Sequence, residues 1–587
     1  MFSYVRFRYR RALRRLRRTV RTSHKLTAAY IERHLWGKWH QLRVVRRFLL
    51  LWWLVAAIGL VGLLQQLGAI AQIAQIAVSL PGGTYSEAAV GTVQTLNPVL
   101  PESTTTGDIN RLIFSGLTRY NSRRQLIPDL ATAWEVSSDG KSYTFHLRHG
   151  VKWHDGVPFT SADVAFTLAA IQNPDSRSPL ASSWDGVKVD VKDDFTVTFT
   201  LPQALNSFLD STTVGIVPRH LLESVEPSLL REAAFNQNPV GTGPFKIKTF
   251  APSAKIIELA ANPKYYLGKP KIDEFQFKLY DTPAKTLQAY AQRQVTSPGR
   301  IYPELAAEAG RQTGLSEYNL TLPDAQTLFF ATADPILGDK DLRQILSRSI
   351  DRELVLDAAT GAQGTIVTQP LLPGQLGYTN KYAPATLSPA AARQALDAAG
   401  WTQTGGSRAT RQKTGTKLSL KLVTLSGGEL EQAAREIKRQ WAELGIELQV
   451  VAASREQLQQ TYMRPRNFQL LLYGMNLGSD PDVYSFWHSS QAKDPGINLS
   501  AYTSADADRA LEAGRIKSDP QVRQGKYDAF LKAWNTDVPA VVLYESGYTY
   551  ATSNTVAGLT AHRLVVPADR FYGVERWTVR QRFTPAR

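Results

Sequence analysis

The sequence contains no cysteine among its 587 residues. This absence excludes disulfide bonds, thiolate metal ligands, a cysteine nucleophile and a lipid-modified N-terminal cysteine, and it is compatible with an oxidising or a reducing compartment. The nine histidines form no HExxH pair, and no serine lies in a GxSxG motif, so neither zinc-protease nor serine-hydrolase chemistry has support. We therefore predict that the protein is not an enzyme and that it has no catalytic residue, no metal site and no cofactor.

Two short motifs could be mistaken for reactive sites. His154-Asp155 places an imidazole beside a carboxylate, which is a common pairing for proton transfer, but Asp155-Gly156 is typical of a turn and no third partner lies nearby in the sequence. The segment Gly241 to Pro244 lacks the spacing of either glycine-rich phosphate motif. We interpret both as structural, and we expect the glycines of the second motif to adopt unusual φ angles.

The excess of positive charge is confined to one end of the chain. The formal net charge is +17, and residues 1–47 hold fifteen Lys or Arg and one acid, Glu32. This arm carries +14 and the rest of the chain only +3, so the body lacks the charge that binding to nucleic acid requires. The apolar residues of the arm recur at near-helical spacing, which favours an amphipathic helix on an anionic lipid surface. A topology determinant without a specific partner and a contact with ribosomal or other nucleic acid stay open.

A long segment without charge follows the arm. No charged residue occurs from Phe48 to Ser86, and Trp52 and Trp53 follow a run of arginines as in an interfacial belt. We predict a membrane-spanning helix at 48–80 that continues to Leu80 as a short stalk, with the N-terminus cytoplasmic and the body outside the cell. A cleaved signal peptide, with a cleavage site near Ala69-Ile-Ala71, is the alternative.

The body has two kinds of hydrophobic pattern. Residues 417–424 are typical of a strand, 429–444 of an amphipathic helix and 446–452 of a second strand, which together form a βαβ unit and favour a mainly parallel sheet. Between Tyr120 and Leu201, short alternating runs predict antiparallel strands. A helix is expected after Thr160.

Several motifs follow one another in a recognisable order. They are Asn97-Pro98, PDLATAWEVSSDGKSYTFHLRHGVKWHDGVPFTSADV at 128–164, PVGTGPFK at 239–246, DKDLRQILSRSIDRELV from Asp339, AARQALDAAGW from Ala391 and SDPDVYSFW from Ser479. In these motifs the chain resembles the dipeptide/oligopeptide/nickel-binding family of ABC importer solute-binding proteins, over residues 84–587.

The resemblance implies a bilobal α/β fold like that of periplasmic binding proteins, with a hinge and a smaller inserted β-rich domain. The implied parts are lobe I at 84–119, 239–324 and 550–587, the inserted domain at 120–238, and lobe II at 325–549. The implied function is capture of a peptide or peptide-like solute by lobe closure and delivery to ABC permease subunits, by a monomer. A non-transport ligand sensor or an extracytoplasmic chaperone with the same fold is the alternative, because fold alone does not determine function.

The resemblance also implies a set of ligand-binding residues. They are Leu100, Pro101, Glu102 and Ser103 on lobe I, Trp184 in the inserted domain, and Tyr473, Gly474, Met475, Asn476, Leu477 and Asp480 on lobe II. Core packing accounts for Trp184 equally well. Peptide-binding relatives place an acid that pairs with the ligand ammonium where this chain has Leu477, which cannot form that pair. Asp480 or Glu102 could replace the acid, and a blocked peptide, a glycopeptide, a sugar or another solute stays open as ligand.

Overall fold

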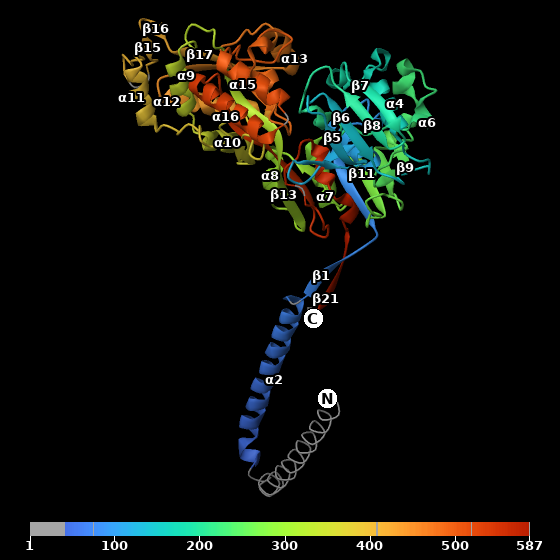
Figure 1. Ribbon diagram of the computed structural model, residues 1–587. Helices are drawn as coiled ribbons and strands as arrows, with labels where there is room; N and C mark the ends of the chain where they lie inside the picture. The colour runs from blue at the N-terminus through green and yellow to red at the C-terminus, as the bar shows by residue number, and fades with distance from the viewer. Residues whose placement is uncertain (1–41, 74, 407–408, 518, 561, 586–587) are drawn as a thin grey trace, which may run out of the picture. The chain divides into compact units, whose positions relative to one another are not determined.

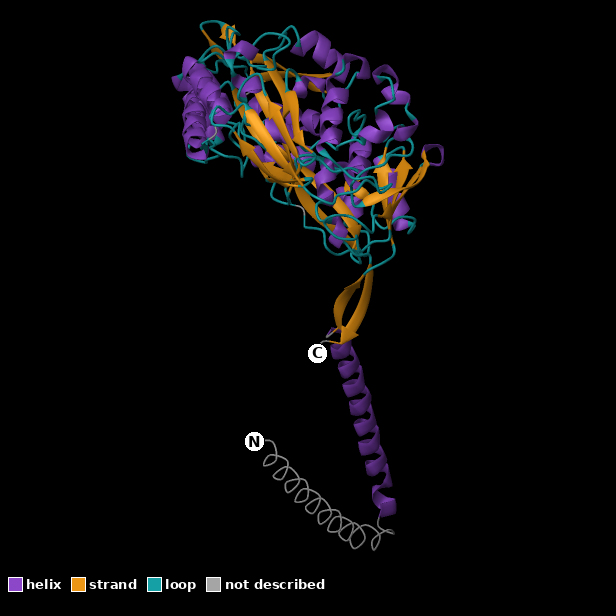
Figure 2. Cartoon of the chain, turned by 45° about the vertical axis from the view of Figure 1, so that its right-hand side comes forward, coloured by secondary structure: helices purple, strands orange, loops and turns teal. Residues whose placement is uncertain are grey.

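The computed structural model describes residues 42–585 except for 74, 407–408, 518 and 561 (Figures 1 and 2). The chain divides into two units, one of which is Ser79–Gln581 and the other the remainder. Each unit is described by itself.

The smaller unit contains the helix α2, Leu42–Ile73, and most of the two-stranded sheet of β1, Gln75–Leu80, with β21, Arg580–Pro585. The predicted continuation of the helix to Leu80 is wrong, because β-branched Ile76 and Val78 favour a strand and β21 provides its partner. Among the described residues, no helix has the length and hydropathy of a membrane span. The predicted span is therefore not confirmed, and residues 1–41 of the basic arm lie outside the described residues.

Three sheets organise the larger unit. The first has the order β2-β11-β10-β9, with β2 parallel to β11 and the other pairs antiparallel. The second is antiparallel, in the order β5-β6-β8-β7. The third has the order β12-β20-β13-β19-β17-β18, and β14 pairs with β20. The strands are β2 Thr84–Val90, β3 Thr118–Tyr120, β4 Leu126–Pro128, β5 Ala131–Val136, β6 Ser142–Leu147, β7 Lys188–Asp193, β8 Thr196–Thr200, β9 Phe245–Ala251, β10 Ile256–Ala261, β11 Glu274–Tyr280, β12 Gly299–Ile301, β13 Leu315–Phe330, β14 Gly364–Ile366, β15 Gln412–Lys413, β16 Thr416–Lys417, β17 Ser419–Leu425, β18 Glu447–Ala453, β19 Leu470–Asn476 and β20 Ala540–Ser553.

The helices pack on these sheets. They are α3 Thr104–Ile113, α4 Ser161–Gln172, α5 Phe208–Ser211, α6 Arg219–Leu222, α7 Pro283–Ala291, α8 Ala306–Ala309, α9 Lys340–Arg348, α10 Arg352–Thr360, α11 Pro389–Ala398, α12 Gly428–Glu443, α13 Arg455–Gln457, α14 Tyr484–Trp487, α15 Ala505–Ile516 and α16 Pro520–Asp537.

The local patterns in the sequence predicted much of this arrangement. The strands β17 and β18 are parallel and α12 connects them, which confirms the βαβ unit. The antiparallel sheet of β5 to β8 confirms the pattern expected between Tyr120 and Leu201. Helix α4 begins after Thr160, whose side chain forms a capping box with Asp163.

Two apolar cores share the strands β13 and β20. Leu320 and Leu322 of β13 belong to the first cluster, which we call core A and which also includes Tyr548 and Tyr550 of β20. From Ala325 onward, β13 faces the cores of the second half of the chain, which we call core B, and residues 540–544 of β20 do the same. The chain thus crosses between the cores at 323–324 and at 545–547. The pairing of β13 with β20 shifts register between Thr321 and Ala325.

Core B has three layers. On β13, Leu328 and Phe330 pack with α9, α10 and α12, whereas Phe329 packs with α15 and α16 on the other face, as the period of a strand requires. Figure 2 shows the strands between these layers of helices. The bilobal α/β class expected from the sequence is confirmed by these two cores and their shared strands.

The loop at Gly241 closes against the end of α3. A Cβ atom on Gly241 would lie 1.9 Å from the carbonyl oxygen of Ile113, and one on Gly243 would lie 2.6 Å from Leu112 O. Neither glycine has a positive φ, so the expected reason for these residues is wrong: close packing, not backbone conformation, requires them.

The side chain of His154 connects the turn at 154–156 to the loop at Gly241. The backbone N–H of Gly241 donates to Nδ1 at 3.1 Å, which leaves Nε2 to donate to the carbonyl of Gly243 at 3.1 Å. Burial lowers the pKa of His154 to about 4. The imidazole is therefore neutral at pH 7 and has a structural role here.

Arg570 forms a buried ion-pair cluster beside core A. Its guanidinium donates to Asp108 Oδ1 at 2.7 Å and Oδ2 at 2.8 Å and to Glu87 Oε1 at 2.6 Å, and all three side chains are at most 7% exposed. Burial opposes the charged form, yet Asp108 and Glu87 hold the pKa of Arg570 well above its usual value. Glu87 lies on β2, Asp108 on α3 and Arg570 near the C-terminus, so this cluster joins distant parts of the chain.

Replacement of Arg570 by Met will lower the free energy of unfolding by about 3–5 kcal/mol, because two buried carboxylates lose their counter-charge. Chemical denaturation of the full chain in detergent measures this. Arg439→Met is the control, since that side chain is 52% exposed and its loss should cost less than about 1 kcal/mol. Equal effects of the two substitutions would contradict the assignment.

His154 will make stability depend on pH. Its pKa is about 4 in the folded chain against 6.5 for the free group, so its contribution is complete above pH 6.5 and is lost as the pH falls through about 4. The wild-type protein should lose more stability than His154→Gln between these pH values in denaturation curves. Parallel curves for the two proteins would show that His154 does not titrate in this window.

Candidate functional site

A cavity of about 400 Å³ opens beside α3. Its walls come from the loop before α3, from α3 itself, and from segments 180–184, 210–215 and 566–568. Three of the predicted ligand residues, Pro101, Ser103 and Trp184, line it, together with the charged side chains of Asp108, Asp210 and Arg111. The loop and residues of the predicted inserted domain thus meet at one cavity.

The start of α3 is fixed by its own side chains. Ser103 is the N-cap and its hydroxyl accepts from the backbone N–H of Thr106 at 3.1 Å. One turn later, Asp108 accepts a hydrogen bond from Arg570, which ties the helix to the buried ion-pair cluster. Ser103 is therefore both a helix cap and part of the cavity wall.

Trp184 packs in the core, as one of the two interpretations expected, and its ligand role stays a prediction. It is 4% exposed and packs edge to face against Phe208, with the ring centroids 5.4 Å apart. It also borders the cavity.

The other two residues of the predicted lobe I loop differ: Leu100 is buried and Glu102 is exposed. Leu100 is fully buried. Glu102 forms an ion pair with Arg231 at 2.8 Å and thus already has a counter-charge. Because this pair is partly exposed, its release costs less than about 1 kcal/mol. Replacement of the missing acid by Glu102 therefore stays a prediction.

The predicted lobe II segment forms β19 and the turn after it. Met475 and Leu477 are buried in core B, and Tyr473 packs against it. A Cβ atom on Gly474 would meet Gln326 Oε1 at 2.8 Å. Asn476 is exposed and donates from Nδ2 to Asp324 at 2.8 Å. Of this segment Asn476 is the exposed residue, whereas Gly474 is closed off by Gln326. The ligand role of all five residues stays a prediction.

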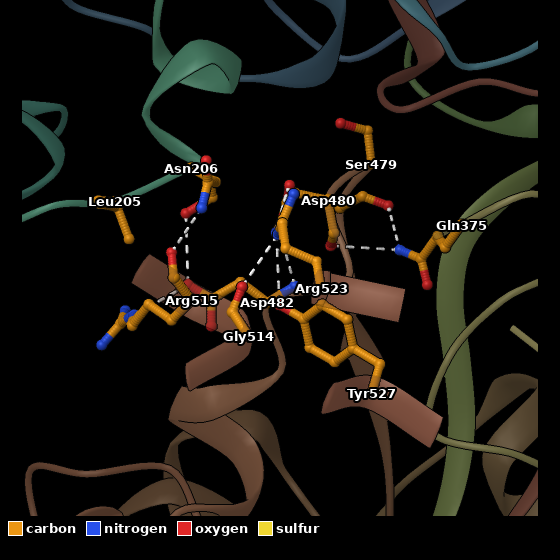
Figure 3. Close-up of polar contacts among 12 residues, drawn as sticks. Leu205, Asn206, Gln375, Ser479, Asp480, Asp482, Gly514, Arg515, Arg523 and Tyr527 are labelled. Atoms are coloured by element: carbon orange, nitrogen blue, oxygen red, sulfur yellow. Dashed lines mark hydrogen bonds and ion pairs between the residues drawn. The ribbon is translucent and has the colours of Figure 1, made fainter. Parts of the chain in front are cut away.

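Asp480 is held inside the predicted lobe II. Its carboxylate accepts two hydrogen bonds from Nη2 of Arg523, at 2.8 and 3.0 Å (Figure 3). Burial raises the pKa of Asp480, against the effect of Arg523. Gln375 donates to the carbonyl of the same residue at 3.4 Å. Asp480 is therefore committed to an internal ion pair.

The same region touches the inserted domain. Nδ2 of Asn206 donates to the carbonyls of Arg515 at 2.8 Å and Lys517 at 2.6 Å, and Arg515 pairs with Asp482 at 3.0 Å (Figure 3). Ser479 donates to Asp210 at 2.7 Å, whose pKa is raised by burial. Asp210 thus belongs both to the cavity wall and to this contact.

Two acids at the crossing were not predicted as site residues. Asp324, on β13, and Glu429, in the first turn of α12, are half-buried, and neither has an ion-pair partner among the described residues. Asp324 accepts from Asn476 and Glu429 accepts from Ser546 at 3.2 Å. Burial raises the pKa of both carboxyl groups. Partly buried acids without a direct ion pair favour a cation as partner.

A second cavity, of about 260 Å³, adjoins the first. Ser103, Thr104 and Asp108 line both. Its wall includes Arg300, whose positive charge lowers the pKa of Asp324 and of Glu429 against the effect of burial. The cavity beside α3 is therefore connected electrostatically with the acids at the crossing. No group of described residues could hold a metal ion.

Comparison with known families agrees with this architecture. The model of the bacterial extracellular solute-binding proteins, family 5 (middle region), matches residues 125–496. The chain belongs to this family. The resemblance noted in the sequence is thereby confirmed, and the motifs at 128–164 and 239–246 lie within the match.

Individual relatives extend the match over most of the chain. The oligopeptide-binding protein AppA of Bacillus subtilis is 28% identical over 84% of this chain and 91% of its own length. Protein XP55 of Streptomyces lividans is 30% identical, over 82% and 84%. The structure of B. subtilis AppA in complex with a nonapeptide superposes with a TM-score of 0.64 at 25% identity, and covers 85% of this chain and 99% of that chain.

Asp480→Ala will lower the stability of the protein and will not change its affinity for a ligand ammonium. Removal of the carboxylate leaves Arg523 without its counter-charge and should lower the free energy of unfolding by roughly 2–5 kcal/mol. Denaturation of the full chain, with Asp506→Ala as an exposed control, measures the effect. If Asp480 instead bound a ligand ammonium, the substitution would leave stability unchanged and weaken binding of amine-bearing peptides.

Proposed function

We propose that this chain is the membrane-anchored, extracytoplasmic solute-binding component of an ABC importer. It captures peptides or peptide-like solutes between two lobes, closes on them and delivers them to the permease subunits without altering them. The proposed parts are those given by the sequence: lobe I at 84–119, 239–324 and 550–587, the inserted domain at 120–238 and lobe II at 325–549. The protein acts as a monomer.

The crossing of β13 and β20 between the two cores is the observation that carries this proposal. Apolar residues of both strands pack into core A on one side and into core B on the other, while Asp324 and residues 545–546 are polar. Two strands that connect separate cores allow rigid-body rotation of one core against the other. A ligand that contacts both cores then selects the closed state by its binding energy.

The acids at the crossing define the ligand end that we expect to bind there. Asp324 and Glu429 form no ion pair among the described residues, although the positive charge of Arg300 lowers the pKa of both against the effect of burial, and Leu477 carries no charge. We infer that a free ammonium or another cationic group of the ligand lies near these two carboxylates. The rest of the ligand would extend along the cavity beside α3, where Pro101, Ser103 and Trp184 contact it.

The anchor is proposed from the character of α2. Its described large apolar side chains are 53% (Val55) to 75% (Trp53) exposed. The chain carries no charge from Phe48 to Ser86. A lipid bilayer would cover this apolar surface. The arginines before Phe48 would keep the N-terminus in the cytoplasm and place the arm on anionic lipid.

Ligand identity can be tested on the full chain. We expect the protein, purified in detergent without unfolding and then denatured, to release peptides that mass spectrometry detects. In calorimetry, a free-amine tripeptide pool should bind more tightly than the N-acetylated pool, and Asp324→Asn and Glu429→Gln should each reduce that difference by about tenfold.

Glu317→Gln is the matched control, because it removes an exposed acid from the same strand as Asp324. It should leave the preference for free amines unchanged. Equal affinity of the wild-type protein for both pools, or an unchanged preference in both crossing variants, would contradict the assignment of these acids.

The anchor predicts a specific fractionation. Full-length protein should remain in membranes after an alkaline carbonate wash, and protease added outside the cell should digest the body. A soluble product shortened by about seventy residues would instead support a cleaved leader. Deletion of residues 2–40 should leave peptide uptake intact, whereas loss of a cellular response with normal uptake would favour the sensor alternative.

A further inference from the structure

A cavity of about 270 Å³ lies within core B, away from the cavity beside α3. The end of α9, the start of α10, the loop at 382–385 and the end of α16 surround it, and residues 540–542 of β20 form its floor. Its lining contains two arginines, Arg348 and Arg352, and no acidic residue.

Arg352 is the feature that distinguishes this cavity. The residue is 5% exposed, and its one side-chain hydrogen bond among the described residues runs from Nε to the carbonyl of Val542 at 2.9 Å. Its terminal amino groups are not among the fully enclosed unpartnered atoms, so they open onto the cavity. No carboxylate of the described residues pairs with it, and burial lowers its pKa to about 10. The guanidinium is still charged at pH 7 and lacks a counter-ion.

A neighbouring arginine shows how this chain satisfies a buried guanidinium. Arg343, on α9, is 6% exposed and donates to four backbone carbonyls, those of Val538 at 3.0 Å, Leu337 at 2.7 Å, Gly338 at 3.0 Å and Asp537 at 2.6 Å. Arg352 has one such bond. A buried guanidinium is costly when its donors are unsatisfied, so the difference indicates that an external anion completes the site at Arg352.

Other donors surround the same space. The hydroxyls of Ser347 and Thr368 line the cavity and have no hydrogen-bond partner among the described residues. Arg348 donates from Nε to the carbonyl of Ala385 at 3.1 Å and has no ion pair within the described part of the chain. These groups offer only donors and potential donors to a negatively charged ligand.

The remaining wall is apolar. Trp534, Val538 and Val541 line it and are at most 8% exposed. A planar guanidinium fork matches the two oxygens of a carboxylate, and an apolar wall favours a hydrocarbon body over water. The volume exceeds that of a single water-sized group several-fold.

We propose that this cavity binds a small organic monocarboxylate, with the carboxylate on Arg352 and its short apolar chain against Trp534. The site is separate from the proposed peptide cleft and does not depend on it. Since Arg352 also holds β20 next to the crossing, the bound anion contacts the strand that connects the two cores.

Thermal unfolding and calorimetry of the full chain in detergent test the proposal, with sodium hexanoate as probe and hexanol, inorganic phosphate and sodium chloride as comparisons. Hexanoate should stabilise the wild-type protein saturably, and the other solutes should not. Arg352→Met should weaken hexanoate binding at least about tenfold. Without anion, this variant should unfold at a higher temperature than the wild type, because an uncompensated buried charge has been removed.

Arg435→Met, at a 62% exposed side chain, is the control and should change neither property. Arg352→Lys keeps the charge without the fork and should also weaken hexanoate binding, which provides a test if the Met variant does not fold. The proposal is overturned if hexanoate does not stabilise the wild-type protein, if phosphate alone does so, or if the response survives in the Arg352 variants.

Discussion

The buried pair of Arg124 and Glu545 holds together the place where the chain passes between its two cores. The side chains are 5% and 4% exposed and lie 2.8 Å apart. Arg124 also donates from Nε to the carbonyl of Leu564 at 2.9 Å and from Nη2 to that of Thr321 at 3.3 Å. Arg124 lies far before β13 and β20 in the sequence, so its contacts join both crossing strands to a distant segment of the chain. Its backbone is left-handed, with φ 64°. A non-glycine residue in this conformation persists only where its surroundings determine it.

This constraint explains why charge accumulates at the crossing. Apolar contacts end there, because neither core extends into 323–324 or 545–547, and polar side chains can occupy the space only if they are paired or reach solvent. Glu545 is paired with Arg124, whereas Asp324 and Glu429 are not paired with any cation of the described residues. The same contrast separates Arg343 from Arg352 in core B. Charged side chains that lack a partner, beside similar side chains that have one, indicate where a ligand binds.

The sequence predicted local structure well where one segment carries the whole signal. Alternation and amphipathic spacing at 417–453 and 131–200 predicted the βαβ unit and the antiparallel sheet. Turn chemistry and capping correctly predicted the start of α4 after Thr160. The strand β1 was missed because its partner, β21, lies some five hundred residues later, and a local apolar pattern cannot distinguish a helix from a strand that pairs at such a distance.

Candidate site residues were harder to predict because their state depends on distant partners. Nothing near Asp480 in the sequence indicates that Arg523 neutralises it, and nothing near Asp324 indicates that Asn476 is its neighbour across the sheet. The strand pairing that places Asp324 next to the position of Leu477 exists only in the folded chain. Pro323 and the acid after it, inside a long strand, were the available signal for a crossing.

The central claim is that the two cores move toward each other when a solute binds between them. The absence of cysteine allows two spin labels to be introduced without background, at Asp185→Cys in the inserted domain and Glu456→Cys in lobe II, both exposed. Under conditions in which calorimetry detects binding of a free-amine tripeptide pool, pulsed electron paramagnetic resonance should show a shorter and narrower distance between the labels. An unchanged distance distribution at saturation would contradict the account.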